Sequence, residues 1–241
     1  MHNSHMSGAM PRIALVTGAN RGLGKGIARR LAKRGLHVVV TARTEYAARV
    51  AADELTGDGC AVAHHQLDVT DPASVPRAVA DTAFTYGRLD VLVNNAAVAI
   101  DQARPAAAAD MERVRATLDT NVVGAWRCCA ATIPEMMKNG YGRIVNISSQ
   151  LGTFAEMDEG SAAYRVSKAG LNALTRIIAA ELRGNNILVN AASPGKVDTR
   201  LAYGSGERSP TDAADTVVWL ATLPDDGPTG GLFHEQKPVD W

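Results

Sequence analysis

Tyr164 and Lys168 are the residues whose types and spacing most directly indicate chemistry in this sequence. Side chains four residues apart on a helix lie on the same face, so the phenol and the ammonium can act together. A nearby positive charge stabilises the phenolate and lowers the tyrosine pKa, which lets a tyrosine exchange a proton near neutral pH. The pattern predicts a general acid/base at Tyr164, although the same spacing also occurs on helix faces that only contact water.

A second chemical feature is the run from Ile13 to Gly24, in which an apolar strand leads into glycines that open a helix. In this geometry backbone N–H groups and the helix N-terminus bind a pyrophosphate, and glycine allows the tight turn and close approach of the phosphate. The glycines, Gly18, Gly22 and Gly24, follow the spacing GxxxGxG instead of GxGxxG. An ordinary strand-to-helix turn is the alternative, but the position on the first expected strand favours a dinucleotide.

The end of the second expected strand indicates which nicotinamide cofactor is bound. For NAD, an acidic side chain would hold the ribose 2′-hydroxyl at this point. The sequence instead has Arg43, which can pair with a 2′-phosphate, and Arg21 in the glycine turn can reach the same group. We therefore expect NADP(H), the alternative being that Arg43 only contacts solvent.

Composition excludes several classes of protein. The 241 residues are 46% hydrophobic and contain 25 Lys+Arg against 25 Asp+Glu, so no net field favours nucleic acid or an anionic membrane. Three cysteines are too few for a disulfide framework, which suits a reducing compartment, and no apolar run is long enough to span a bilayer. The adjacent His64 and His65 point to opposite faces of a strand, so we expect no metal site. We expect a cytoplasmic protein.

These chemical residues must be positioned by alternating strands and helices. Residues 1–10 have the character of an expression-vector remnant rather than a signal peptide. After them, short β-branched runs alternate with longer Ala-rich stretches, which is typical of βαβ units around a mostly parallel sheet. The expected strands are 13–17, 37–41, 61–67, 91–94, 143–147, 187–190 and a last one near 231–234. The expected helices are 22–34, 44–56, 72–86, 107–138, 162–183 and 211–221.

No linker-like segment divides this pattern. We therefore expect one doubly wound, Rossmann-type α/β domain over residues 11–241, with about seven strands and helices on both faces.

Several further motifs occur in a fixed order with the two above: Asn94-Asn-Ala-Ala97, Asn121, Ser149 and Pro194-Gly195. Together with the glycine turn and Tyr164-x-x-x-Lys168, they resemble the short-chain dehydrogenase/reductase family across nearly the whole chain. Within that family, Thr41-Ala-Arg43 is similar to the NADPH-dependent carbonyl reductase branch.

The resemblance implies four catalytic residues: Asn121, Ser149, Tyr164 and Lys168. Tyr164 would protonate the carbonyl oxygen, Ser149 would orient it, Lys168 would lower the Tyr164 pKa and bind the nicotinamide ribose, and Asn121 would hold a water that links Lys168 to solvent. Three alternatives stay open, namely Ser148 in place of Ser149, a surface role for Asn121, and a capping role for Asp68.

The resemblance also implies a cofactor site, in which Asp68 would contact the adenine amine and Asn94 would brace the sheet beneath the cofactor. The expected cofactor-binding residues are Gly18, Asn20, Arg21, Gly22, Leu23, Gly24, Arg43, Asp68, Val69, Asn95, Ala96, Ala97, Tyr164, Lys168, Pro194, Gly195, Val197 and Thr199.

Two features of the sequence depart from the usual pattern of the family. Ala96-Ala97 stands where glycine is common, which we expect to be tolerated if the backbone φ is negative there. The stretch from Ser149 to Tyr164 is about two residues longer than usual, so residues 155–160 are expected to form a loop whose acidic side chains face water or the substrate.

The first functional hypothesis is an NADPH-dependent reductase of ketones, aldehydes or quinones. A biosynthetic, polyketide-type ketoreductase is the second, and a dinucleotide-sensing regulator without turnover is the third. The long Ala-rich helices at 107–138 and 162–183 favour a homodimer or homotetramer, with a monomer as the alternative.

Overall fold

A computed structural model describes residues 10–101, 105–198, 206 and 208–241. The expected vector-derived segment, apart from Met10, and the expected cofactor residue Thr199 therefore lie outside the described residues. Among the described residues, no helix combines the length and apolar character that crossing a membrane requires.

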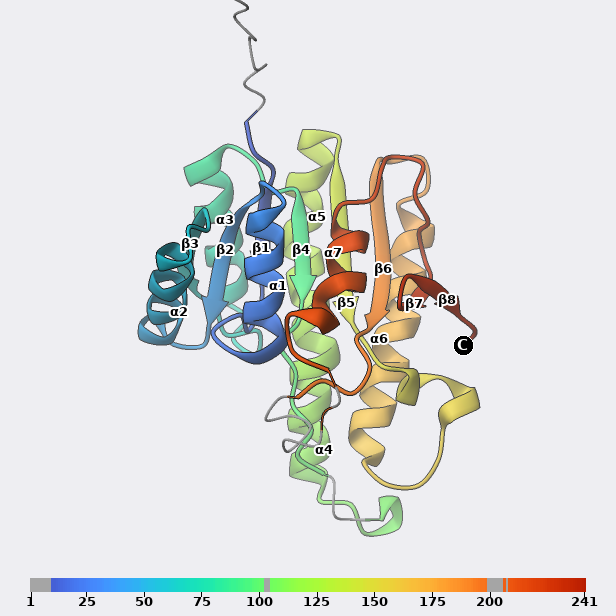
Figure 1. Ribbon diagram of the computed structural model, residues 1–241. Coiled ribbons are helices and arrows are strands. Elements are labelled where there is room, and N and C mark those ends of the chain that lie inside the picture. Colours follow the sequence, from blue (N-terminus) through green and yellow to red (C-terminus); the bar gives the residue numbers. More distant parts are fainter. Residues whose placement is uncertain (1–9, 102–104, 199–205, 207) are drawn as a thin grey trace, which may run out of the picture.

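The described strands form one sheet in the order β3-β2-β1-β4-β5-β6-β7-β8 (Figure 1). All neighbouring strands are parallel except the last pair, β7 and β8. The strand order changes direction between β1 and β4, and in such sheets ligands bind at the carboxyl ends beside that point. The strands are β1 Ile13–Val16, β2 His37–Ala42, β3 Val62–Gln66, β4 Val91–Asn94, β5 Gly142–Ile147, β6 Ile187–Ser193, β7 Leu232–His234 and β8 Lys237–Val239.

Helices cover both faces of the sheet (Figure 1). Val38 and Val40 of β2 pack into one core and Val39 between them packs into the other, so the strand is buried on both faces as its unbroken apolar run predicts. The first core contains residues of α1 Gly22–Lys33, α2 Glu45–Gly57 and α7 Asp215–Ala221. The second contains residues of α3 Ser74–Tyr86, α5 Ala125–Asn139 and α6 Ala162–Glu181. The predicted doubly wound fold is confirmed.

The expected single helix over 107–138 is wrong in detail. A 3₁₀ turn, Ala106–Ala108, comes first, and α4 Met111–Leu118 begins only after Asp110, whose carboxylate accepts hydrogen bonds from the N–H groups of Glu112 and Arg113. A π-helical segment, Asp119–Gly124, then joins α4 to α5. Since π-turns inside helices frequently mark functional sites, this segment is of interest for Asn121.

The eighth strand, β8, was not predicted. It pairs with β7 through a turn at Glu235 and Gln236, both of which have positive φ values, 49° and 62°. Two-residue hairpin turns of this kind are usually signalled by Asn or Gly, which are absent here. Pro238 within a three-residue strand also argues against a strand, and is tolerated because β8 is the edge.

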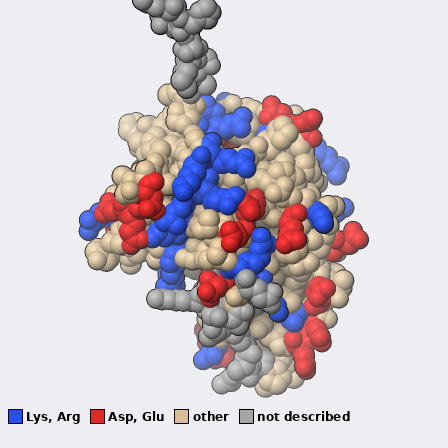
Figure 2. All heavy atoms as spheres, in the orientation of Figure 1, with Lys and Arg blue, Asp and Glu red and all other residues tan. Residues whose placement is uncertain are grey.

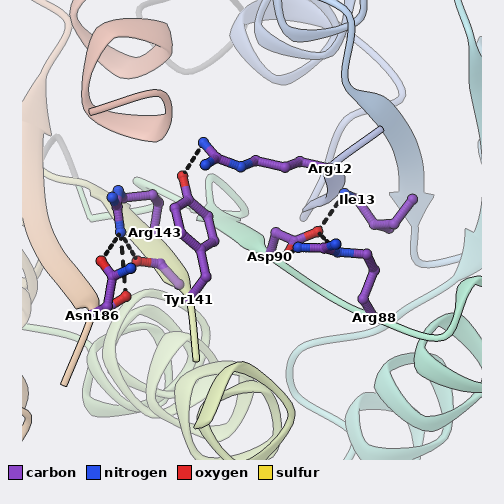
Figure 3. A network of polar contacts seen from close by, with 8 residues as sticks. Arg12, Ile13, Arg88, Asp90, Tyr141, Arg143 and Asn186 are labelled. Carbon is purple, nitrogen blue, oxygen red and sulfur yellow. Dashed lines mark hydrogen bonds and ion pairs between the residues drawn. The ribbon is translucent and has the colours of Figure 1, made fainter. Parts of the chain in front are cut away.

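The amino-terminal edge of the sheet is held by a buried polar network (Figure 3). The Arg143 side chain has no exposed area and donates hydrogen bonds to the carbonyl oxygen of Leu223 and to the carboxylate of Asp225, at 2.9 and 2.8 Å. The Tyr141 ring lies between two guanidinium groups, with its centroid 4.1 Å from that of Arg143 and 3.8 Å from that of Arg12. This edge is a rigid support opposite the edge that carries the expected site.

His64 and His65 point in opposite directions, as expected for neighbours on a strand. The His64 ring contacts Glu45 of α2 at 2.8 Å, and the His65 ring contacts Asp81 of α3 at 3.0 Å. Within the described residues, no group of three or more His, Cys, Asp or Glu residues is placed to hold a metal ion.

Candidate active site

The glycine turn lies at the carboxyl end of β1 and leads into α1. Gly18 and Gly22 have positive φ values of 62° and 51°, which favour glycine. A Cβ on Gly24 would come within 2.5 Å of the Asn95 amide nitrogen, so the helix can approach the strand ends only without a side chain there. Arg21 at the N-cap makes no capping hydrogen bond through its side chain, and the first turn of α1 contains no acidic residue. The helix N-terminus is therefore suited to receive a pyrophosphate.

Thr17 and Asn95 fasten this turn to the end of β4. The Thr17 hydroxyl accepts hydrogen bonds from the backbone N–H groups of Asn95 and Ala96, at 2.9 and 3.0 Å. The Asn95 amide donates in return to the carbonyl oxygens of Thr17 and Gly18. Ala96 and Ala97 are not among the described residues with positive φ, so the alanines are accommodated as expected. Thr17 is a site residue that the sequence analysis did not single out, although it immediately precedes the first glycine.

Basic side chains gather along α1 on the face shown in Figure 2. Lys25, Arg29 and Arg30 of this helix form ion pairs with acidic residues of neighbouring segments. Arg21 and Arg43, by contrast, are exposed and form no ion pair with the described residues. Two guanidinium groups at the carboxyl edge of β1 and β2 are thus available to a phosphate.

Asp68 and Val69 follow β3 at the same edge. One carboxylate oxygen of Asp68 accepts hydrogen bonds from the N–H and the hydroxyl of Thr70 at 2.9 and 2.8 Å, which fixes the side chain without a helix-capping role. Asp71 makes the turn before α3, accepting from the N–H of Ala73. Val69 is buried and packs against Gly124. A Cβ added to Gly124 would come within 2.8 Å of the Val69 side chain.

Ser149, Tyr164 and Lys168 come together beyond the end of β5. The Ser149 hydroxyl lies close enough to the Tyr164 phenol to lower its pKa, and the Lys168 ammonium lies 5.4 Å from the centre of the Tyr164 ring. Lys168 is buried and donates to the carbonyl oxygen of Ile147 at 2.7 Å. Ser148 points away into the core, where its hydroxyl lies 2.5 Å from Asn172. Of the two adjacent serines, only Ser149 contacts Tyr164.

Burial governs the electrostatics of this group. Desolvation raises the pKa of Tyr164 to about 12, and the neighbouring Ser149 hydroxyl offsets only part of that rise. Burial also lowers the pKa of Lys168 to about 8. The net Tyr164 pKa is therefore raised, because loss of solvation is the largest cause, and the lowering expected from Lys168 stays a prediction. At neutral pH Tyr164 is a neutral phenol.

Asn121 is buried inside the π-helical segment and is not a surface residue. Its amide exchanges two hydrogen bonds of 2.8 Å with the backbone of Val98 and donates to the Ser167 hydroxyl at 3.0 Å. Asn121 therefore links the segment after β4 to helix α6, which it contacts at Ser167, the residue before Lys168.

The segment after β6 lies at the same edge of the sheet, on the far side of β5 from β4. Pro194 is buried and Gly195 has a φ of 76°, with His234 of β7 against it. Val197 is buried and bridges to Arg208. These expected cofactor residues lie at the end of β6.

Two further expected cofactor residues belong to the glycine turn. Leu23 packs against the core beneath α1, and Asn20 is half-buried.

The expected loop between Ser149 and Tyr164 is present and exposed. The Arg165 guanidinium holds it by donating to the carbonyl oxygens of Glu156, Glu159 and Gly160, at 2.6, 3.3 and 2.9 Å. The acidic side chains of the loop are exposed to water. The extra length is thus anchored next to Tyr164.

The chain is similar to known proteins over most of its length. The model of the family described as short chain dehydrogenase matches residues 12–209. Carbonyl reductase (NADPH) 3 of Mus musculus is 36% identical over 95% of this chain and 98% of its own length. Oxidoreductase UcpA of Salmonella typhimurium is 38% identical over 86% of this chain and 77% of its own length.

Solved structures are also similar. An actinorhodin polyketide ketoreductase variant with NADPH has a TM-score of 0.85 at 31% identity, covering 93% of this chain and 95% of that one. Salutaridine reductase from Papaver somniferum has a TM-score of 0.82 at 28% identity, covering 93% of this chain and 99% of that one.

Proposed function

The chain belongs to the short-chain dehydrogenase/reductase family, and we propose that it reduces a ketone, aldehyde or quinone carbonyl to an alcohol with NADPH. The observation that carries the proposal is the group formed by Ser149, Tyr164 and Lys168 at the carboxyl edge of the sheet, beside a glycine turn suited to a dinucleotide.

Tyr164 is the proposed proton donor. Its high pKa keeps the phenol protonated at neutral pH, so it can donate to a carbonyl oxygen as negative charge develops there. Ser149, which lies next to the Tyr164 phenol, can donate to the same oxygen and orient it. The protonated phenol is the form that reduction needs, whereas oxidation would need the phenolate as base.

Lys168 and Asn121 support the donor. With a pKa of about 8, Lys168 is mostly protonated at neutral pH and can hold the nicotinamide ribose hydroxyls beside Tyr164. Asn121 fixes the segment after β4 against α6 and, as proposed, holds the water through which Lys168 exchanges protons with solvent.

The residues present fit NADP(H). The uncapped N-terminus of α1 and the positive-φ glycines provide a phosphate site, and Arg21 with Arg43 supplies charge for a 2′-phosphate. When bound, the reduced nicotinamide supplies the hydride. The relatives named for NADPH support this choice.

Loss of NADPH absorbance with a panel of ketones, aldehydes, quinones and a reactive diketone tests the proposal. Tyr164→Phe should reduce the rate at least about 100-fold, the usual contribution of a general acid, while NADPH binding followed by fluorescence is unchanged. Tyr46→Phe, at an exposed tyrosine on α2, is the matched control and should keep full activity. Cofactor binding without turnover of any carbonyl would favour the dinucleotide-sensing regulator instead.

A biosynthetic ketoreductase is the second candidate, favoured by the similarity to the polyketide ketoreductase structure. A preference for polycyclic or aromatic ketones over small aliphatic ones in the same panel would support it. The predicted cytoplasmic location stays a prediction.

We also propose a homodimer or a larger homo-oligomer that uses α5 and α6. Trp126 and Met137 lie eleven residues apart on α5, and Val166 and Ile177 do so on α6, so each pair faces one side of its helix. All four side chains are more than half exposed, at 55%, 52%, 55% and 53%. The two helices cover the same face of the sheet, and two such apolar stripes on one face suit a second copy of the chain.

Light scattering tests this interface. Trp126→Glu should shift the protein to monomers, whereas the control Phe84→Glu, at a 92% exposed residue of α3, should not. A monomeric wild-type protein, or an equal shift in both variants, would contradict the assignment.

A further inference from the structure

Helix α6, which carries Tyr164 and Lys168, begins without the usual local support. Its N-cap residue, Ser161, has a left-handed backbone with φ 48° and ψ 45°, whereas capping serines normally have an extended backbone. The Ser161 side chain makes no capping hydrogen bond, and the first turn contains no acidic residue. The orphan N–H groups of this turn therefore depend on acceptors from elsewhere.

One such acceptor is Asp101, 62 residues earlier in the chain. Its Oδ2 accepts a hydrogen bond of 2.6 Å from the backbone N–H of Ala163, the residue immediately before Tyr164. A carboxylate at a helix N-terminus also interacts favourably with the helix dipole, and charge-assisted bonds of this length are strong.

The segment that carries Asp101 is itself held at two points. Asn121 binds both backbone polar groups of Val98, and the Arg113 guanidinium donates to the carbonyl oxygen of Ile100 at 3.1 Å. This segment continues from Asn94–Ala97, which adjoins the glycine turn. Asp101 is thus a direct connection between the cofactor side of the crevice and the first turn of the catalytic helix.

The second carboxylate oxygen of Asp101 is buried and has no hydrogen-bond partner in the described structure. It adjoins a cavity of about 10 Å³ lined by Asp110, Arg113 and Ala162, roughly the space of one water. A buried carboxylate oxygen needs a hydrogen-bond donor, and this cavity has the space for a water that can supply one.

We propose that Asp101 is a positioning residue for the reaction: by fixing the first turn of α6 it places the Tyr164 hydroxyl against the substrate carbonyl. Side chains on a helix lean towards its N-terminus, so the Tyr164 phenol lies over the turn that Asp101 holds. A displacement of about 1 Å of a reacting group can reduce a rate about 100-fold. The inference rests on the proposed function.

Three variants test the proposal. Asp101→Ala removes the acceptor and should lower kcat about 10- to 100-fold, with the affinity for NADPH within about 2-fold of wild type. Asp101→Asn keeps an oxygen acceptor and should recover kcat to within about 3-fold of wild type. Asp110→Ala is the matched control, because Asp110 caps α4 and adjoins the same cavity but makes no hydrogen bond to α6; it should leave kcat nearly unchanged.

Hydrogen exchange followed by mass spectrometry provides a readout independent of turnover. In Asp101→Ala, peptides covering the first turn of α6 should exchange faster, while those covering its last turns keep the wild-type rate. Unchanged exchange there would overturn the proposal, as would Asp101→Asn being as slow as Asp101→Ala, or NADPH affinity falling in parallel with kcat. If Asp101→Ala does not fold, the kcat of Asp101→Asn is compared with that of Asp110→Ala. A kcat of Asp101→Asn more than about 3-fold below wild type, with Asp110→Ala unchanged, would overturn the proposal. A wild-type protein that reduces no carbonyl would refute the proposed function, yet the exchange result could still be measured.

Discussion

Replacing Lys168 by methionine should stabilise the protein without cofactor while abolishing its activity. Lys168 is fully buried, and burial lowers its pKa from 10.5 to about 8. The unfolded chain therefore holds a proton on this side chain between pH 8 and 10.5 that the folded protein releases. Stability rises with pH wherever the unfolded state binds more protons. The stability that goes with a neutral Lys168 is therefore fully present above pH 10.5 and is lost as the pH falls through about 8.

The magnitude follows from the shift. At about 1.4 kcal/mol per pKa unit, keeping the ammonium buried costs the folded protein about 3 kcal/mol at neutral pH. Methionine has a similar length and no charge, but it gives up the hydrogen bond to the Ile147 carbonyl, worth about 1 kcal/mol. Lys168→Met should therefore raise the free energy of unfolding by about 2 kcal/mol at neutral pH.

The pH dependence is the decisive measurement. In urea unfolding without cofactor, the advantage of Lys168→Met over wild type should shrink by about 2 to 3 kcal/mol between about pH 7 and pH 10. Lys138→Met, at a lysine whose side chain is 68% exposed, is the control and should show no such trend. A difference between Lys168→Met and wild type that stays constant over this range would refute the desolvation of the ammonium.

Three other substitutions test separate parts of the molecule. Arg43→Asp should raise the KM for NADPH about 10- to 100-fold and improve the use of NADH, as initial rates with both cofactors would show; unchanged NADPH affinity would remove the 2′-phosphate assignment. Arg143→Met should lower the free energy of unfolding by about 2 to 4 kcal/mol, because buried carbonyl groups such as that of Leu223 lose their donor, while kcat of the folded protein in a standard assay is unchanged. Arg165→Ala should speed hydrogen exchange of the loop at 155–160 and change the KM for the carbonyl substrate, and protection equal to wild type would show that the guanidinium does not anchor the loop.

The parts of the site that were predictable from the sequence are those that arise from local spacing. A strand followed by Gly18, Gly22 and Gly24 predicts a tight turn, because glycine adopts the positive φ values that such a turn requires. Residues four apart share a helix face wherever the helix lies. The buried strands were similarly predictable, since runs such as Val38 to Val40 suit no other position in a sheet of this kind.

The parts that were missed depend on distant residues or on a balance of opposing energies. The pKa of Tyr164 depends on how completely the surrounding chain removes water, which spacing does not report. The π-helical segment around Asn121 and the carboxylate of Asp101 at the start of α6 arise from contacts across 23 and 62 residues. A single aspartate in the segment after β4 carries no sequence pattern that marks it as a helix cap.

Desolvation connects the stability and the chemistry of this site. The burial that makes the Lys168 ammonium costly also raises the Tyr164 pKa, so the two effects share one cause. A more exposed site would relieve Lys168, but the water that it admits would compete with the phenol for the carbonyl oxygen. A substitution that admits water beside Lys168, such as a smaller residue at the buried Ser148, whose hydroxyl contacts the Lys168 backbone, should therefore lower kcat and raise the Lys168 pKa together. If either changed without the other, the single cause argued here would be wrong.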